Sequence, residues 1–520
     1  MQIIDNRGLL FKLRHPERIV DIIPKSKVIA EHHDHSEVLV HWGLEEAQVL
    51  KNLKLKDIPS PILGHYKWTG LHKPFEHQKD TASFLTLHRR AFCFNEQGTG
   101  KTASVIWAAD YLMKLGLVKK VLVICPLSIM DSAWRADLFT FAIHRTVDVA
   151  HGSREKRKKI IASNAEFTII NFDGVEIVAD DIEKAGYDLI VIDEANAYKN
   201  PTTNRWKVLN KLVKPDTWLW MLTGTPASQS PVDAYGIAKL VNPSGVPKFY
   251  SHFRDQVMQK ITMFKWIPKP DSESIVHNAL QPAIRYTKEE CLDLPELTYT
   301  TRDVPLTPQQ NKYYEKIRQD MLVRAAGEEI TVVNAAASMN KLLQLSGGAV
   351  YSDTGEVVEF DASSRLSVLR EVIEESSHKV LVFVPFTHTI ELLQKHLTKN
   401  GITCDVINGS VSVNKRADIV KTFQDQPEPK VLLIQPKAAS HGLTLTAANT
   451  IIWYAPCTSV ETYLQANARI DRPGQVNNMT IVHIKGSPVE SKMYSLLQGN
   501  IDNHQKVIDL YRQEISSEES

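Results

Sequence analysis

The stretch NEQGTGKT, residues Asn95 to Thr102, decides how the first part of the chain folds. A short apolar run, Ala91 to Phe94, precedes it and apolar residues at helical spacing follow it, so the sequence predicts a strand, a glycine turn and a helix. Gly98 and Gly100 lack a Cβ, which lets successive backbone N–H groups converge on an anion at the positive end of the helix. The pattern therefore predicts a phosphate site. The alternative is a glycine turn before an ordinary helix.

Further residues in and before this turn predict a nucleotide with a metal ion. Lys101 would reach the β- and γ-phosphates, and the hydroxyl of Thr102 would ligate Mg²⁺. Upstream, in KPFEHQ, Gln78 stands where a glutamine can read the adenine edge. The sequence thus predicts ATP and Mg²⁺ as cofactors, with the following residues at the nucleotide: Gln78, Gly98, Thr99, Gly100, Lys101 and Thr102.

An acidic pair follows a second apolar run. DEAN, Asp193 to Asn196, comes after Leu189 to Ile192, so the pair is expected at the carboxyl edge of a sheet, where ligands of open α/β sheets bind. Asp193 would hold Mg²⁺, and Glu194 would orient and deprotonate the attacking water. An isolated Asp-Glu after a strand is usually a polar loop, but the upstream Gly-Lys-Thr favours the catalytic interpretation.

Short apolar runs with turns between them recur in two series. Continuous apolar strands that alternate with helical segments indicate a parallel sheet covered on both faces, so the sequence predicts an α/β fold with two such lobes. The first series is Val121 to Cys125, Phe167 to Ile170, Leu189 to Ile192 and Trp218 to Leu222. The second is Lys379 to Phe386, Cys404 to Asn408, Val431 to Gln435, Thr450 to Tyr454 and Thr480 to Lys485.

The second series has no glycine turn, and its chemistry is predicted in QANARIDRPGQ, Gln465 to Gln475. Arg469 and Arg472 are three apart, so we expect them to share one helical face and to reach a triphosphate bound to the other lobe. An arginine supplied across a cleft stabilises transition-state charge and can be worth ~10³–10⁵ in rate. The alternative is surface salt bridging by both arginines.

Composition limits the class of protein. Lys plus Arg total 61 and Asp plus Glu total 60, so no global field indicates nucleic acid, although a basic groove can be balanced by acid elsewhere. The five cysteines contain no CxxC pair, which argues for reduced thiols and against a structural zinc site. No apolar run approaches membrane-spanning length and no signal core opens the sequence, so we expect a cytoplasmic protein without a membrane partner.

The predicted organisation has five parts. They are a small N-terminal appendage (1–60), a first lobe (61–245), a brace between the lobes rich in proline, aromatic and charged residues (246–300), a second lobe (301–495), and a C-terminal helix and tail (496–520).

In the appendage we expect strands at Gly8 to Leu13 and Ser36 to Trp42 and a helix at Leu44 to Leu53. Its run His32 to His35 suggests metal. Adjacent residues of an extended chain point to alternate sides and four of them cannot close on one ion, so we predict a solvated polar turn.

Taken in order, these motifs resemble those of helicase superfamily two, and specifically of the Swi/Snf (chromatin-remodeller-type) ATPases, from Lys73 to about Ser495. The segments that carry the resemblance are NEQGTGKT, VLVICPLSIMDSAW, DEANAYKN, LTGTP, IRYTKEECLDLP, KVLVFVPFTHTIELL, NGSVSVNKR, KAASHGLTLTAAN and QANARIDRPGQ. Asn196 stands where the family has His, and Ser440-His441 departs from its glycine pattern. The large helical insertions are missing or short, so the chain resembles the compact bacterial and bacteriophage members.

The resemblance implies two RecA-like lobes with a helical brace and assigns roles to further residues. Catalytic residues would be Glu194, Gln465, Arg469 and Arg472, and Asn196, Thr223 and Thr225 would couple hydrolysis to DNA. DNA contacts would come from Pro126, Ser128, Asn171, Asn408, Gly409, Ser410, Lys437 and Gly442. The basic run Arg154 to Lys159 would assist, unless it is simply a solvated helix face.

The function implied is a DNA-dependent ATPase that translocates along double-stranded DNA and remodels DNA or DNA-bound proteins without separating strands. Bacterial or phage-infected cytosol is the expected location, while the protein partners and the pathway stay open. One rival is a strand-separating DNA or RNA helicase. Another, from a different class, is a nucleic-acid-binding scaffold with a degenerate ATPase, against which the intact Lys101, Glu194 and Arg472 count.

Overall fold

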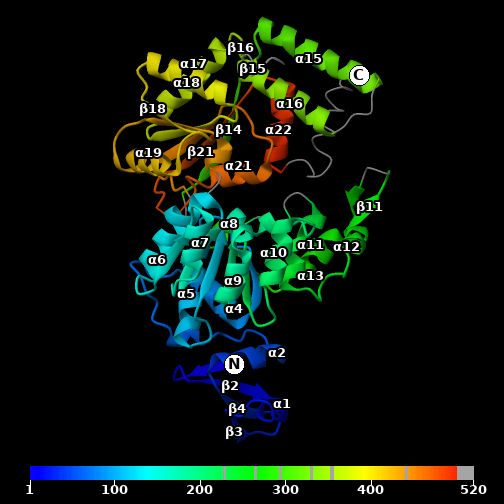
Figure 1. Ribbon diagram of the computed structural model, residues 1–520, viewed down its shortest axis with the longest axis vertical. Coiled ribbons are helices and arrows are strands. Elements are labelled where there is room, and N and C mark those ends of the chain that lie inside the picture. Colours follow the sequence, from blue (N-terminus) through cyan, green and yellow to red (C-terminus); the bar gives the residue numbers. More distant parts are fainter. Residues whose placement is uncertain are drawn as a thin grey trace. The chain divides into compact units, whose positions relative to one another are not determined.

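The computed structural model describes residues 1–224, 226–227, 230–262, 266–291, 295–327, 332–351, 357–439, 443–472 and 474–499. These residues fall into two compact units, the first from 1–227, 231–258 and 269–291 and the second from the rest (Figure 1). Across the described ranges, no helix combines the length and the apolar character needed to cross a membrane.

The sheet of the first unit consists, in its described part, of seven parallel strands in the order β13-β5-β10-β9-β6-β8-β7. Their bounds are β5 Arg90–Cys93, β6 Val121–Cys125, β7 Val147–Ala150, β8 Phe167–Asn171, β9 Leu189–Asp193, β10 Trp218–Leu222 and β13 Ala283–Ile284. Every residue of β6, β8 and β10 is buried, as their apolar runs predict. The parallel sheet expected in this part of the chain is confirmed.

Helices connect these strands, and the one that follows the glycine turn is the most deeply buried. Residues 103–113 of α5 are all buried; most of them are apolar, and the buried carboxylate of Asp110 accepts hydrogen bonds from Tyr66 and Arg145. After residue 60, the helices of the unit are α3 Ile62–His65, α4 Glu76–Leu87, α5 Lys101–Lys114, α6 Ala136–Phe141, α7 Arg154–Ile161, α8 Phe172–Ile177, α9 Ala179–Ala185, α10 Asn204–Leu212, α11 Ala234–Val241, α12 Tyr250–Val257, α13 Ser272–Ala279 and α14 Lys288–Cys291. Shorter turns are η1 Leu127–Ile129, η2 Met130–Arg135, η3 Ala195–Tyr198 and η4 Pro231–Asp233.

The second unit contains, among its described residues, a six-stranded parallel sheet in the order β14-β21-β20-β17-β19-β18. The strands are β14 Leu297–Asp303, β17 Lys379–Phe383, β18 Cys404–Ile407, β19 Val431–Ile434, β20 Ala448–Trp453 and β21 Met479–Lys485. The helices are α15 Pro308–Gly327, α16 Val332–Ser346, α17 Ser363–Glu375, α18 Thr387–Lys399, α19 Val413–Asp425, α20 Pro436–Ala439, α21 Val460–Asn467 and α22 Pro488–Leu497. A small hairpin, β15 Ala349–Tyr351 with β16 Val357–Glu359, completes the unit. The α/β fold class is therefore confirmed in both units.

The residues predicted as a brace, 246–300, hold α12, α13 and α14, a two-stranded sheet of β11 Met258–Lys260 and β12 Trp266–Pro268, and edge strands for both larger sheets. Strand β13 joins the first sheet beside β5, and β14 joins the second beside β21. The five-part division of the chain and the role of this segment as a brace stay predictions.

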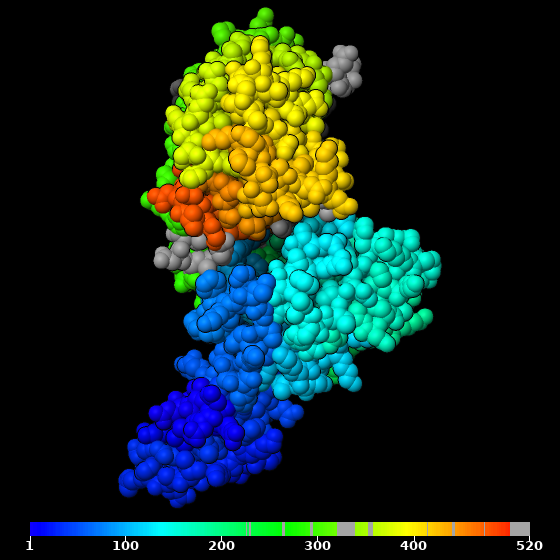
Figure 2. Space-filling model, turned by 90° about the vertical axis from the view of Figure 1, so that its left-hand side faces the viewer, coloured from blue at the N-terminus to red at the C-terminus, as the bar shows by residue number. Residues whose placement is uncertain are grey.

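Residues 1–60 form an antiparallel sheet of their own in the order β1-β2-β4-β3, which projects from the rest of the first unit (Figure 2). Its elements are β1 Gln2–Ile4, β2 Gly8–Leu13, α1 Glu17–Val20, β3 Ser26–Glu31, β4 Ser36–His41 and α2 Leu44–Asn52. The two strands and the helix expected here are confirmed, whereas β1, β3 and α1 were not predicted.

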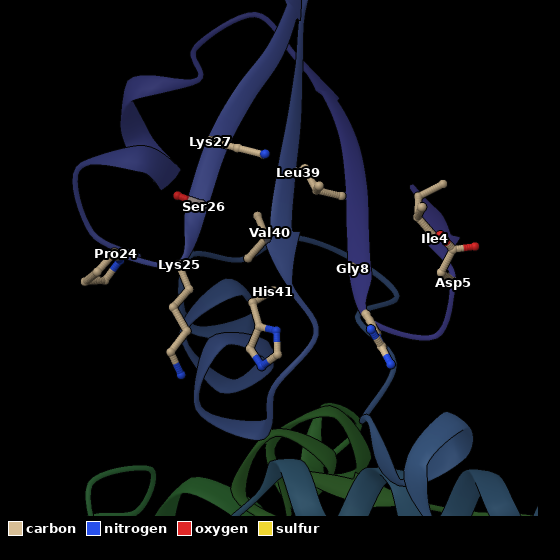
Figure 3. A pocket seen from close by; sticks show the side chains of 11 residues that line it. Ile4, Asp5, Gly8, Pro24, Lys25, Ser26, Lys27, Leu39, Val40 and His41 are labelled. Atoms are coloured by element: carbon tan, nitrogen blue, oxygen red, sulfur yellow. The ribbon is translucent and has the colours of Figure 1, made fainter.

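The two faces of this N-terminal sheet differ. One packs against α2 and buries a core that includes Phe11, Val38 and Trp42. The other carries a pocket of about 460 Å³ lined by residues such as Lys25, Leu39 and His41 (Figure 3).

Candidate active site

The glycine turn lies between β5 and α5, as the sequence predicts. Gly98 has φ of 89° and Gly100 has φ of 79°, backbone angles that favour glycine. Gly100 caps the first turn of α5, and a Cβ there would collide with the side chain of Gln78. The turn therefore depends on glycine for both its backbone conformation and its packing.

Lys101 points back over this turn. Its Nζ donates hydrogen bonds to the carbonyl oxygens of Asn95 at 2.8 Å and Glu96 at 3.2 Å. Thr99 Oγ1 donates to the same Glu96 carbonyl at 2.8 Å, which closes the turn. Thr102, the second residue of α5, is half-buried beside it. Lys101 and Thr102 are thus the first two residues of the helix that follows the turn.

Asn95, which occupies the position where the usual phosphate-binding pattern begins with glycine, has a structural role that sequence reasoning missed. Its side chain is 1% exposed; Nδ2 donates to Thr81 Oγ1 at 2.8 Å and Oδ1 accepts from the Tyr286 N–H at 3.0 Å. One side chain therefore ties helix α4 and the segment after β13 to the turn. The polar residue at the end of an apolar strand was the signal available in the sequence.

Gln78 lies directly against the turn from helix α4. Its Oε1 accepts from the Phe75 N–H at 3.0 Å, and its Nε2 donates to the Thr99 carbonyl at 3.3 Å. His77 Nε2 contacts the same carbonyl at 2.8 Å. The structure brings Gln78 to the nucleotide-binding turn, and its reading of adenine stays a prediction.

The acidic pair ends the central strand β9, and its carboxylates lie close to the turn. Asp193 Oδ2 accepts from Trp134 Nε1 at 2.9 Å, and Oδ1 accepts from the Glu194 N–H at 3.0 Å. Burial raises the pKa of Asp193 above its ordinary value, while the charge of Lys101 and the bond from Trp134 act in the opposite direction. A cation held at this carboxylate would favour its ionised form.

Glu194 adopts a left-handed backbone conformation with φ of 58° and ψ of 60°. Such a conformation costs free energy for a residue with a Cβ, and residues held in it cluster at active sites. Gln97 Nε2, from the glycine turn, donates to Glu194 Oε1 at 3.5 Å. The two motifs that the sequence predicts to cooperate are therefore brought together at one edge of the sheet.

Trp134 is the second residue that sequence reasoning missed. It lies in η2, a π-helical stretch after β6, and its ring is fully buried. A buried indole N–H needs an acceptor, and the neighbouring strand β9 supplies Asp193. Single π-helical turns of this kind are frequent at functional sites.

The predicted coupling residues follow β9 and β10. Thr223 is 1% exposed, and its N–H donates to the Cys93 carbonyl at 3.1 Å. Gly224 lies next to Gln97, so this loop packs against the glycine turn. Asn196 belongs to η3, one residue beyond Ala195, and Thr225 lies outside the described residues. Their role in coupling stays a prediction.

One prediction in the second unit is wrong: Arg469 and Arg472 do not share a helical face, because α21 ends at Asn467. The Arg469 carbonyl accepts from the Leu445 N–H at 3.1 Å, and Arg472 Nε donates to the Ala468 carbonyl at 2.7 Å. The carbonyls of Ala468 and Arg469, which would bond to backbone N–H groups in a continuing helix, therefore accept from other donors.

Both arginines nevertheless reach one loop. Arg469 is 1% exposed and donates through Nη1 to the Leu443 carbonyl at 3.1 Å, whereas Arg472 is half-buried and donates through Nη1 to Thr444 Oγ1 at 3.2 Å. Gln465, on α21, is buried and donates through Nε2 to Glu461 Oε1 at 3.3 Å. The sequence did not predict that both arginines would contact the loop at 443–445.

The residues predicted to contact DNA lie at the carboxyl edges of the two sheets, each within its own unit. In the first unit Pro126 and Ser128 follow β6, and Asn171 ends β8. In the second, Asn408 to Ser410 follow β18, and Lys437 lies in α20 after β19. Lys437 also lines a cavity of about 320 Å³ with Gln435 and Phe386. Gly442 lies outside the described residues.

Hydrogen bonds hold two of these loops in place. Gly409 N–H donates to Gln435 Oε1 at 3.1 Å, and Asn408 Oδ1 accepts from the Ser410 N–H at 3.1 Å. Asn171 is 8% exposed, and its Oδ1 accepts from Arg157 Nη1 at 2.9 Å. Arg157, from the basic run, is itself buried, so this arginine supports Asn171 from the interior and does not belong to a solvated helix face.

Comparisons with known proteins agree with this arrangement of motifs. A family model described as SNF2-related domain matches residues 74–347, more than half of the 520 residues, and one described as helicase conserved C-terminal domain matches residues 364–474. These matches confirm the resemblance to the Swi/Snf ATPases, while an origin among bacterial or phage members stays a prediction.

Similar curated proteins include a chromodomain-helicase-DNA-binding protein 1-like of Mus musculus, 26% identical over 84% of this chain and 50% of its own length. Another is an uncharacterised ATP-dependent helicase of Mycoplasma genitalium, 26% identical over 75% of this chain and 37% of its own length. The chain thus spans about half or less of these relatives. Among solved structures, the Sulfolobus solfataricus SWI2/SNF2 ATPase core in complex with dsDNA aligns over 86% of this chain and 96% of its own, with 22% identity and a TM-score of 0.42.

Proposed function

The chain belongs to the SNF2-related family, and on that premise we propose that it hydrolyses ATP when bound to DNA and translocates along the duplex without separating the strands. The observation that carries this proposal is the carboxyl edge of the first sheet, where Lys101, Asp193 and Glu194 come together around the glycine turn. The relatives' names, which include DNA-binding protein and ATP-dependent helicase, support the choice of substrate and partner.

The glycine turn would bind the phosphates of ATP. Its backbone N–H groups and the N-terminus of α5 supply donors and partial positive charge. Lys101 would exchange its contacts with the Asn95 and Glu96 carbonyls for the β- and γ-phosphate oxygens. Both carbonyls belong to the turn itself, so the ammonium already lies at the segment that would bind the phosphates.

The donor set beside the turn fits Mg²⁺. Asp193 offers carboxylate oxygens and Thr102 a hydroxyl, and a small hard cation prefers oxygen ligands with several waters retained. Trp134 holds one Asp193 oxygen by a 2.9 Å hydrogen bond and so orients the carboxylate. Bound there, the ion would neutralise charge on the phosphates.

Glu194 would accept the proton of the attacking water. Its strained backbone and the contact from Gln97 direct its carboxylate toward the turn that holds the phosphates. In the second unit, Arg472 would stabilise the charge that develops on the γ-phosphate, because it is the less buried of the two arginines. Arg469 and Gln465 would keep the segment around it in position.

Phosphate release measured with no nucleic acid, single-stranded DNA, duplex DNA and RNA tests the substrate. We expect duplex DNA to stimulate hydrolysis most. Stimulation by RNA alone would support the helicase rival, and no hydrolysis under any condition would support the scaffold.

Translocation without strand separation needs its own assay. We expect ATP-driven displacement of a third strand from a DNA triplex, with a forked duplex left intact. Binding should weaken steeply with salt, by about 0.9 log unit of affinity per neutralised phosphate for each decade of salt, because phosphates provide most contacts. Efficient unwinding of the fork would contradict this part of the proposal.

A further inference from the structure

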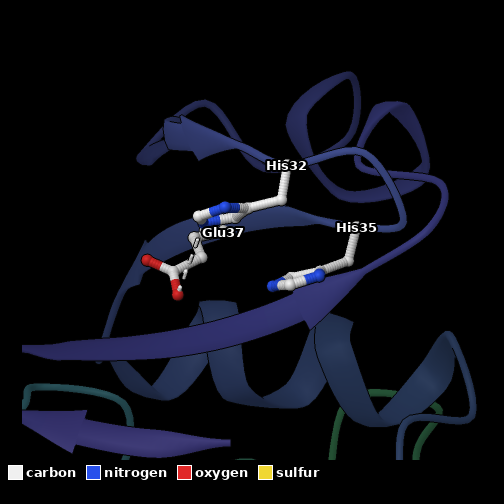
Figure 4. Close-up of side chains that lie close together, drawn as sticks. All are labelled: His32, His35 and Glu37. Atoms are coloured by element: carbon white, nitrogen blue, oxygen red, sulfur yellow. Dashed lines mark ion pairs between the residues drawn. The ribbon is translucent and has the colours of Figure 1, made fainter.

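The turn between β3 and β4 of the N-terminal sheet brings two histidines and a glutamate together on one face. The His32 N–H donates to the His35 carbonyl at 2.8 Å, which closes the turn and places these two residues opposite each other. Glu37 is two residues along β4 from His35, and alternate residues of a strand share a face. Register therefore puts all three side chains on the same side of the hairpin (Figure 4).

The potential ligand atoms of these residues are close to one another. One ligand atom from each of His32, His35 and Glu37 lies within 4.8 Å of the others. The two imidazole rings stack with centroids 4.7 Å apart, and His32 Nε2 lies 4.0 Å from Glu37 Oε1. Ligand atoms around a tetrahedral Zn²⁺ are about 3.3 Å apart, since its bonds to nitrogen are about 2.0–2.1 Å. Side-chain rotations that move the ligand atoms by about 1–2 Å would bring them to this separation.

A second, independent observation concerns His35. Its Nδ1 lies 2.8 Å from Asp34 Oδ1, and because a carboxylate accepts, Nδ1 is the donor in this pair, which leaves Nε2 as the nitrogen with the lone pair whenever the ring is neutral. Nε2 is buried and has no hydrogen-bond partner among the described residues, and it faces Glu37 (Figure 4). A carboxylate on one ring nitrogen with a metal on the other is the usual arrangement of histidine ligands in metal sites.

We propose that His32, His35 and Glu37 bind a divalent transition-metal ion such as Zn²⁺, with Asp34 orienting His35 and a water in the fourth position. Imidazole and carboxylate ligands suit zinc and its first-row neighbours. The ion joins the end of β3 to the start of β4 and so closes the hairpin turn. The exposed pair of Lys12 and Glu37, 3.7 Å apart, is a weak competitor, because the lysine side chain is 68% exposed.

This site differs from the one that the sequence excludes. Four consecutive residues cannot surround one ion, and His33 indeed takes no part in the cluster. The turn removes that restriction by bringing His32 back against His35, and Glu37, outside the His-rich run, supplies the third ligand. The lack of a CxxC pair argues against a zinc site built from cysteines, and none of the three ligands proposed here is a cysteine.

Zinc binding to the full-length, tag-free, metal-stripped protein tests the proposal. Equilibrium dialysis with Zn²⁺ in the absence of ATP should show an equivalent of bound metal that His35→Ala and Glu37→Gln both remove. Asp34→Asn should weaken this binding by about 10-fold or more, since it removes the partner that orients the ring. His33→Ala is the matched control, an exposed histidine in the same turn, and should bind like the wild type.

Histidine nitrogen NMR adds a readout that a change in folding would not imitate. On addition of Zn²⁺ to the wild type, Nε2 of His35 should shift as a metal-bound nitrogen while Nδ1 stays protonated. Circular dichroism and limited proteolysis of each variant establish that the appendage is folded. The proposal is overturned if folded His35→Ala and Glu37→Gln bind as much zinc as the wild type, or if Nε2 of His35 does not respond.

Discussion

The two parallel sheets of this protein share an architecture and differ at their carboxyl edges. The strand β5 of the first sheet leads into a glycine turn that presents Lys101, whereas β17 of the second leads through Pro385 directly into α18. Acidic residues end the central strand of the first sheet, while the second unit offers Arg472 beyond its sheet. The comparison shows that a shared fold fixes where chemistry occurs but not which chemistry occurs.

The edges differ also in how their polar groups are held. In the first, the buried Asn95 ties the glycine turn to helix α4, and the buried Trp134 donates a hydrogen bond to Asp193. In the second, Asn408 and Ser410 are bonded to each other across an exposed loop, and Lys437 lies at the surface. A rigid edge suits a small ligand with fixed geometry, and an exposed edge suits contacts to a phosphate backbone.

The largest expected effect breaks the comparison at the acidic pair. Glu194→Gln should lower ATP turnover by about 10²–10⁴-fold, because it removes the proton acceptor. ATP affinity should remain, since the amide has the same shape and the glycine turn is untouched. Lys101→Ala should lower turnover too, but through loss of a phosphate ligand that weakens ATP binding. Phosphate release and titration with a fluorescent ATP analogue separate the two variants; equal loss of affinity would contradict the assigned roles.

A smaller effect is expected at the second edge. Arg472→Ala should lower turnover by about 10²-fold while ATP affinity falls less, because its charge acts mainly in the transition state. Arg469→Ala should instead lower the free energy of unfolding of the second unit by about 1–3 kcal/mol, because the substitution leaves the Leu443 carbonyl without the buried donor that Arg469 supplies. Turnover and thermal unfolding of both variants would show whether Arg472 contributes to catalysis and Arg469 to stability. Near-normal turnover of Arg472→Ala would refute its role.

The sequence predicts the central strands of both sheets well, and the reason is physical. Strands such as β6 and β20 are buried on both faces and read as continuous apolar runs. Three of the four edge strands, β7, β13 and β14, were missed, whereas the fourth, β18, was predicted although it is only partly buried. Strand β14, LTYTTRD, is largely polar. Apolar runs indicate burial, and a polar edge strand such as β14 is held by backbone pairing that leaves no such signal.

The site divides in the same way. The glycine turn and the acidic pair are local patterns, so Lys101 and Glu194 could be found from the sequence. Asn95 and Trp134 act on residues 14 and 59 positions away. Just beyond the end of α21, the Arg469 carbonyl accepts from the distant Leu445 N–H, whereas the helical spacing of the sequence continues past this end. Features that depend on such tertiary contacts could not be read from spacing.

Trp134 sharpens the comparison by testing what rigidity contributes at the first edge. Trp134→Phe keeps an aromatic ring and removes the hydrogen bond to Asp193, so the Mg²⁺ concentration for half-maximal turnover should rise by about 10-fold. Trp220→Phe is the matched control, because Trp220, in β10 of the same unit, is equally buried but donates to the His88 carbonyl. Turnover measured against Mg²⁺ concentration separates them; identical curves for both variants would remove Trp134 from the metal site.

The smallest effect concerns the coupling of ATP hydrolysis to DNA at the first edge, and it is expected at Asn196. This residue lies in η3, two positions after Glu194, and occupies the position where the family has His. Strand β10, which ends just before Thr223, pairs with β9, which ends just before Glu194. Asn offers a donor and an acceptor but carries no charge near neutral pH. Asn196→Ala should therefore leave ATP hydrolysis without DNA largely intact and reduce the stimulation by duplex DNA by about 5-fold or more, a typical size for coupling between two sites. Asn204→Ala, an exposed asparagine of the same unit bonded to Glu176, is the control and should behave like the wild type. Because the prediction concerns a ratio of rates, a general loss of folded protein cannot imitate it, and unchanged stimulation in Asn196→Ala would remove this residue from the coupling path.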